Sequence, residues 1–214
     1  RSPSRGLGDV YKRQANNPYF LAYTNLNRGV SKNLELGYST SHDDWKLSGA
    51  IFNRWDKDIF DWVYKSDLAR KVNHADIDTF GIEAIASFTF EKIETILGYS
   101  YLNKDADYGM SDIVGSFYAL NFPKHRATLA IIWDPLDSVE VRIDNEWRDQ
   151  RNNVLREGPD HSMYSHLAAS YYPPQYNDLE LFLAYDKPWD EEFQDIPGTP
   201  GRGDQFSLGA TYRW

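Results

Sequence analysis

The sequence predicts an all-β fold: part of an antiparallel, up-and-down transmembrane β-barrel, present as an open, curved sheet of about nine strands. Apolar and polar residues alternate with a period of two, the spacing of a strand with one apolar and one polar face. Short turns alternate with long loops, as at the two ends of an outer-membrane barrel. Aromatic residues make up 15% of the 214 residues, yet the chain lacks the run of about 20 apolar residues that a transmembrane helix needs.

Nine segments show the alternation. Their first apolar residues are, in chain order, Leu34, Trp45, Phe80, Ile93, Ala127, Val139, Met163, Leu179 and Phe206. The second segment becomes irregular in DIFDWVY (58–64). A strand of about 11 residues, tilted by about 40°, spans roughly 28 Å, which is close to the thickness of a hydrocarbon core.

The connections are of two kinds. Short turns are expected at residues 41–44, 90–92, 134–137 and 173–178, and a modest connection near 65–71. Long loops are expected at 103–123, 150–162 and 187–203. We therefore expect the long loops at one end of the sheet, the short turns at the other, and strand 205–214 at an edge.

Charge distinguishes the two faces. In the segment 139–148, apolar Val139, Val141 and Ile143 alternate with five charged residues: Glu140, Arg142, Asp144, Glu146 and Arg148. A barrel has lipid outside and a wet, polar lumen inside. We expect the five charges to face the lumen, and a second set to contact outer-membrane lipid: Val139, Val141, Ile143, Leu179, Leu181 and Leu183. A soluble β-sandwich, with its polar face in water, is the alternative.

Five segments, in order, resemble TonB-dependent receptors. They are VSKNLELGYS (30–39), WKLSGAIFNRWDKDIFDWV (45–63), DIDTFGIEAIASF (76–88), YALNFPKHRATLAIIWDP (118–135) and IPGTPGRGDQFSLGATYRW (196–214). The resemblance implies about the last nine strands of a 22-stranded barrel, in the bacterial outer membrane. It also implies TonB-energised uptake of a ferric siderophore, cobalamin or glycan. The plug domain that contacts TonB would then precede this chain.

Three parts of the chain are expected. Residues 1–14 resemble translated sequencing-adapter read-through, and a genuine basic loop is the alternative. Residues 15–30 would be the remnant of an extracellular loop, and residues 31–214 would be the C-terminal part of the barrel. The last strand resembles the signal that the barrel-assembly machinery reads, carried by Phe206, Leu208, Ala210, Tyr212 and Trp214.

Neither a catalytic nor a metal site is expected. The chain has no cysteine, and its net charge of −9 argues against nucleic acid as a partner. The five histidines lack ligand spacing, and no nucleophile–base pair is evident, so we expect no enzyme and no cofactor. The acidic loop residues Asp186, Asp190, Glu191, Glu192 and Asp195 are expected to be solvated, with Ca²⁺ binding as the alternative. The sequence does not identify ligand-binding residues. Another kind of outer-membrane barrel, namely a porin, an enzyme or an adhesin, is a further alternative.

Overall fold

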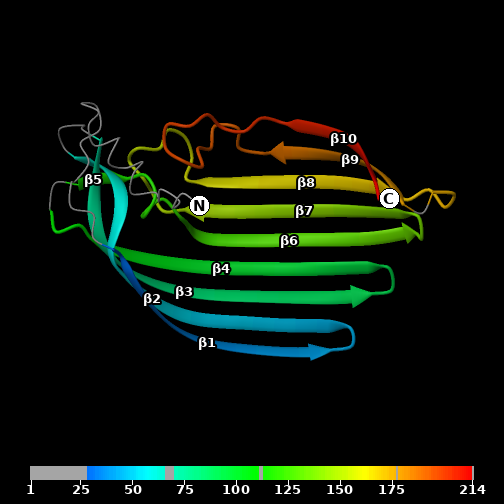
Figure 1. Ribbon diagram of the computed structural model, residues 1–214, viewed down its shortest axis with the longest axis horizontal. Coiled ribbons are helices and arrows are strands. Elements are labelled where there is room, and N and C mark those ends of the chain that lie inside the picture. Colours follow the sequence, from blue (N-terminus) through cyan, green and yellow to red (C-terminus); the bar gives the residue numbers. More distant parts are fainter. Residues whose placement is uncertain (1–27, 66–69, 111–112, 177, 214) are drawn as a thin grey trace, which may run out of the picture.

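The computed structural model describes residues 28–65, 70–110, 113–176 and 178–213, and these form one antiparallel sheet (Figure 1). Its strands are β1 (Val30–His42), β2 (Trp45–Lys65), β3 (Arg70–Phe90), β4 (Ile93–Asp107), β5 (Ile113–Ser116), β6 (Pro123–Leu136), β7 (Val139–Gln150), β8 (His161–Tyr171), β9 (Leu179–Pro188) and β10 (Gln205–Tyr212). In these residues, no helix is both long and apolar enough to cross a membrane.

Nine of the strands follow one another in space as they do in the chain, so the predicted up-and-down order is confirmed. The order is β1-β2-β3-β4-β6-β7-β8-β9-β10, with every neighbouring pair antiparallel. The short connections meet at the turn end of the sheet and the long ones at the loop end, on the right and left of Figure 1. Strand β10 forms an edge, also as expected. Trp214 lies outside the described residues, as do residues 1–14 and most of 15–30.

The loop end differs from the prediction. Strand β4 continues to Asp107, and β5 pairs with β2 inside what was expected to be a single loop. Four residues are too few for a period of two to be recognised, which is why β5 was missed. The irregular segment 58–64 begins at a register shift between Asp56 and Ile59, where Asp58 has a φ of 54°. This β-bulge lets β2 continue for 21 residues.

Register divides the side chains into an apolar and a polar face. One row of hydrogen-bonded neighbours crosses eight strands on the apolar face: Trp45, Phe88, Thr95, Ile131, Ile143, Leu167, Tyr185 and Phe206. A row on the polar face reads Gly37, Ala50, Glu83, Ser100, Arg126, Arg148 and Ser162. The alternation read from single strands therefore continues across the whole sheet.

A small apolar core lies at the loop end. Its buried side chains include Val63, Val72, Ala75, Ile77, Phe117 and Phe122. They come from the extensions of β2 and β3 and from the segment around β5 that covers them. Away from this core the apolar side chains of the sheet are largely exposed, for example Leu36 at 75% and Leu208 at 77%.

Two phenylalanines of the polar face cover glycines on the neighbouring strand. Phe52 pairs with Gly81 and Phe182 with Gly209. A Cβ atom built on Gly81 would lie 2.1 Å from Cζ of Phe52, and one on Gly209 would lie 2.4 Å from Cζ of Phe182. The glycines therefore provide the space in which the rings pack against the neighbouring backbone.

We predict that Gly81→Ala lowers the free energy of unfolding by about 1–3 kcal/mol, because the new methyl group displaces the Phe52 ring. Gly37→Ala is the matched control, since its Cβ would have no neighbour closer than 3.6 Å. Urea unfolding of the full chain in lipid measures both variants. Equal effects of the two substitutions would contradict the packing role. So would a double variant in which Gly81→Ala lowers the free energy of unfolding as much in the Phe52→Ala background as in the original chain.

Candidate functional site

The loop end of the polar face is the candidate site, and one buried carboxylate organises the first part of it. Asp61 of β2 is 1% exposed. It accepts hydrogen bonds from the hydroxyls of Tyr108 (2.7 Å) and Ser116 (2.5 Å) and from the backbone N–H groups of Tyr118 (3.4 Å) and Ala119 (3.2 Å). A buried carboxylate needs such donors. Asp61 thereby fastens the connection between β4 and β6 to the extended β2.

Tyr108 is held as a neutral donor in this arrangement. Burial raises the pKa of Tyr108 well above its ordinary value, and the charge of Asp61 raises it further. A second negative charge beside Asp61 would be unfavourable in these surroundings. Tyr108 therefore keeps its proton throughout the neutral pH range.

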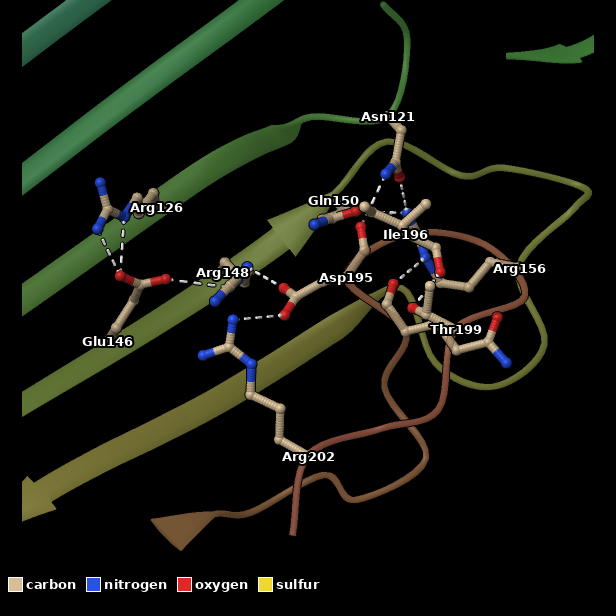
Figure 2. Close-up of polar contacts among 11 residues, drawn as sticks. Asn121, Arg126, Glu146, Arg148, Gln150, Arg156, Asp195, Ile196, Thr199 and Arg202 are labelled. Carbon is tan, nitrogen blue, oxygen red and sulfur yellow. Dashed lines mark hydrogen bonds and ion pairs between the residues drawn. The ribbon is translucent and has the colours of Figure 1, made fainter. Parts of the chain in front are cut away.

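A buried arginine connects the three loops. The side chain of Arg156, in the loop between β7 and β8, is 0% exposed. Its guanidinium donates to five acceptors: Asn121 Oδ1 (2.5 Å), Gln150 Oε1, Asp160 Oδ1, the backbone oxygen of Gln194 (3.2 Å) and that of Arg151 (3.4 Å). Asn121 precedes β6 and Gln194 lies between β9 and β10. One planar donor group, with its five N–H bonds, therefore links all three long connections (Figure 2).

The loop between β9 and β10 packs closely on itself and on its neighbour. A Cβ atom on Gly201 would lie 1.7 Å from the backbone oxygen of Glu191, so no larger residue fits there. The Phe193 ring is 7% exposed and lies beneath two guanidinium groups, those of Arg148 (5.4 Å) and Arg156 (5.7 Å). This fixes the loop over the polar face of β7.

Charged groups alternate from the sheet to this loop. Glu146 accepts from Arg126 (2.5 Å) and pairs with Arg148 (3.0 Å). Asp195 then pairs with Arg148 (2.5 Å) and with Arg202 (3.2 Å), as Figure 2 shows. Three guanidinium groups thus meet two carboxylates at one end of the polar face.

A second polar cluster lies on the adjacent strands. Asp186 of β9 accepts from the hydroxyl of Tyr164 and lies 2.6 Å from Nδ1 of His166, both on β8. His166 is paired in register with Asp144 of β7. The polar face thus presents carboxylate, imidazole, phenol and guanidinium groups together near the loops.

The sequence-predicted charges all lie on this face. Glu146 and Arg148 belong to the site, whereas Arg142 pairs with Asp144 (2.7 Å) nearer the turn end. Glu140, nearer still to that end, is in register with Ser170. The acidic loop residues are dispersed: Asp186 and Asp195 have the partners given above, Asp190 accepts from the N–H of Met163 (3.0 Å), and Glu191 pairs with Lys187 (3.7 Å).

Among the residues of the site that sequence reasoning missed are three charged ones: Asp61, Arg156 and Arg202. Asp61 lies in the segment that reads as irregular, and the two arginines lie in predicted long loops. The residues expected to carry the assembly signal, Phe206, Leu208, Ala210 and Tyr212, occupy the apolar face of β10.

A family model described as "TonB dependent receptor-like, beta-barrel" matches residues 1–212. No sequence among the curated proteins matches the chain.

Solved structures match over most of the chain. The FrpB iron transporter from Neisseria meningitidis (F3-3 variant) gives a TM-score of 0.64 at 14% identity, over 90% of this chain and 32% of that one. Copper transporter OprC gives 0.64 at 13%, over 89% and 32%. Outer-membrane expressed OmpT of Vibrio cholerae gives 0.57 at 13%, over 86% and 56%. The chain spans about a third of the length of FrpB or OprC.

We predict that Asp61→Asn loosens the segment 113–120, because the new amide places an NH₂ group opposite hydroxyl and N–H donors. An unsatisfied buried pair of this kind costs about 1–3 kcal/mol. Proteinase K digestion followed by mass spectrometry should show faster cleavage in this segment. Asp105→Asn, an exposed carboxylate on β4, is the control. Unchanged cleavage in Asp61→Asn would show that the carboxylate does not hold the loop.

Proposed function

The chain belongs to the TonB-dependent receptor β-barrel family of bacterial outer-membrane proteins, and we propose that it forms the C-terminal wall of a receptor for TonB-energised nutrient uptake. In this proposal the polar face lines the lumen and the apolar face contacts lipid. TonB would act through a plug domain encoded ahead of these residues. The observation that carries the proposal is the family match over residues 1–212.

The two faces support a membrane-spanning wall. Trp45 and Trp55 lie ten residues apart on β2, both on the apolar face and both 37% exposed. At about 3.3 Å per residue and a tilt of about 40°, they are separated by about 25 Å along the membrane normal, the height of the apolar band between aromatic girdles. Trp133 and Trp147 of β6 and β7 are likewise exposed on this face.

The loop end supports a receptor role. Its connections are ordered by the buried Asp61 and Arg156 groups, and they carry polar side chains toward the lumen face. Such fixed polar groups can orient a ligand. We propose a scarce nutrient of the ferric siderophore, cobalamin or glycan class as the cargo; the similar structures at 13–14% identity support the fold alone.

The test is energised uptake by the full chain, as its gene encodes it, in a host that lacks its own receptors. Cells are supplied with radiolabelled ferric siderophores, cobalamin and glycans, with and without a functional TonB. We expect one cargo to accumulate only when TonB is present. The proposal would be contradicted if a cargo accumulated without TonB, or if none of these cargoes accumulated.

Another outer-membrane barrel is the second candidate, because OmpT of Vibrio cholerae matches 86% of the chain. A porin-like function predicts passive flux of small sugars in liposome-swelling measurements. A receptor closed by a plug predicts little flux.

We predict that Leu181→Arg lowers the free energy of unfolding in lipid by about 1–2 kcal/mol, because it places a charge on the lipid-contacting face, three residues into β9 from the turn end, where the cost is smaller than at mid-membrane. Thr211→Arg is the matched control: it lies one register position away, on the polar face opposite Glu180. Chemical unfolding of the full chain in lipid bilayers compares them. Similar losses would contradict the assignment of the faces.

We propose further that the C-terminal strand is read during assembly. Deletion of Trp214 should lower the amount of assembled, heat-modifiable protein in the outer membrane more than it lowers the melting temperature of the purified variant. Loss of one interfacial ring costs only a few kcal/mol at most, too little to unfold a closed barrel. Normal assembly of the deletion variant would exclude this role and leave a structural one.

A further inference from the structure

The pair Arg148 and Arg202 has the form of an anion site that is already occupied. Asp195 places one carboxylate oxygen 2.5 Å from Nη1 of Arg148 and the other 3.2 Å from Nη2 of Arg202. Two guanidinium groups on opposite sides of one carboxylate are the arrangement in which arginines bind an oxyanion of any origin. Here the oxyanion comes from the chain itself.

The Asp195 carboxylate has one exposed ion pair, whereas the backbone that carries it is fixed. The side chains of Arg148, Asp195 and Arg202 are 23%, 32% and 70% exposed, so the pair with Arg202 is the exposed one, and exposed ion pairs contribute little to stability. By contrast, Asn121 Nδ2 donates to the backbone oxygen of Asp195 (2.7 Å), and the buried Arg156 holds the adjacent Gln194. The Asp195 side chain can therefore leave by rotation while its backbone stays in place.

Charge favours an incoming anion. The group of Arg126, Glu146, Arg148, Asp195 and Arg202 has three positive and two negative charges, in a chain whose net charge is −9. When the Asp195 side chain turns away, Arg148 keeps its ion pair with Glu146. Arg202 loses its ion pair with Asp195, the partner that it has among the described residues. A ligand carboxylate would restore what Arg202 loses.

We propose that Arg148 and Arg202 bind a carboxylate group of the transported ligand, and that Asp195 occupies their site until the ligand replaces it. This inference rests on the proposed function, and it names the substrate class: a cargo that presents carboxylates. Asp195 acts as an internal competitor, so that weak anions are excluded and a cargo with several carboxylates displaces it.

The loop offers a matched control carboxylate. Asp204 pairs with Lys187 (2.9 Å) and accepts from Tyr185 (2.6 Å), whose side chains belong to the apolar-face side of β9. Asp204→Asn thus changes the net charge of the same loop by the same amount as Asp195→Asn, but away from the arginine pair.

The experiment is calorimetric titration of the full chain in detergent with citrate, and with trimethyl citrate as the uncharged counterpart. We expect Asp195→Asn to increase the affinity for citrate by about fivefold, the range set by an exposed ion pair. Arg202→Gln should decrease it about tenfold, as for loss of one charge-assisted contact. Asp204→Asn should leave it unchanged, and trimethyl citrate should not bind.

Three outcomes would overturn the proposal: equal gains in Asp195→Asn and Asp204→Asn, a lower affinity in Asp195→Asn, or no citrate binding by that variant. If any of these outcomes is found together with TonB-dependent uptake of another cargo, the carboxylate site is contradicted while the proposed function stands. If the titrations give the expected affinities but no TonB-dependent uptake is found, the proposed function is contradicted while the carboxylate site stands.

Discussion

Backbone pairing is the constraint on which the rest of this structure depends. Strands that cross a membrane must pair every N–H and C=O group with a neighbouring strand, because lipid offers no partners. A continuous antiparallel ladder meets this requirement, and its pleat sends successive side chains to opposite faces. Within a strand, successive residues therefore alternate between the two faces except at a bulge, and the row from Trp45 to Phe206 shows that the apolar face continues across eight strands.

Different interactions stabilise the loop end. The buried apolar residues there are few, and the connections are joined instead by two polar groups. Asp61 collects four donors and Arg156 five acceptors, so each satisfies a buried charge while linking segments distant in the sequence. The ion pairs of Asp195 with Arg148 and with the exposed Arg202 lie beside these buried groups. Different residues thus stabilise the loops and bind the proposed ligand. The buried Asp61 and Arg156 hold the loops in place, and the arginines that pair with Asp195 are available to a ligand.

The sequence was sufficient for the sheet because period two is a local property. It predicted nine strands, the alternation of turns and loops, and the common face of Glu140 to Arg148. It was insufficient where structure depends on pairing between distant segments. The four residues of β5 show no usable period, and the bulge at Asp56–Ile59 interrupts one. Arg156 reads as a solvated loop charge, and only the fold brings Asn121, Gln150 and Gln194 to it. The acidic segment from Asp186 to Asp195 was recognised, but the separate partners of its members were not.

Single-cysteine scanning of β7 tests whether one face of this sheet contacts lipid and the other a wet lumen. The 214 residues contain no cysteine, so each introduced thiol is unique among them. Spin labels placed from Val139 to Arg148, in the full chain in lipid bilayers, report collisions with oxygen and with a water-soluble nickel complex. We expect accessibilities that alternate with period two, with oxygen dominating at Val139, Val141 and Ile143 and nickel at the charged positions. High nickel accessibility at every position would contradict this assignment of the faces.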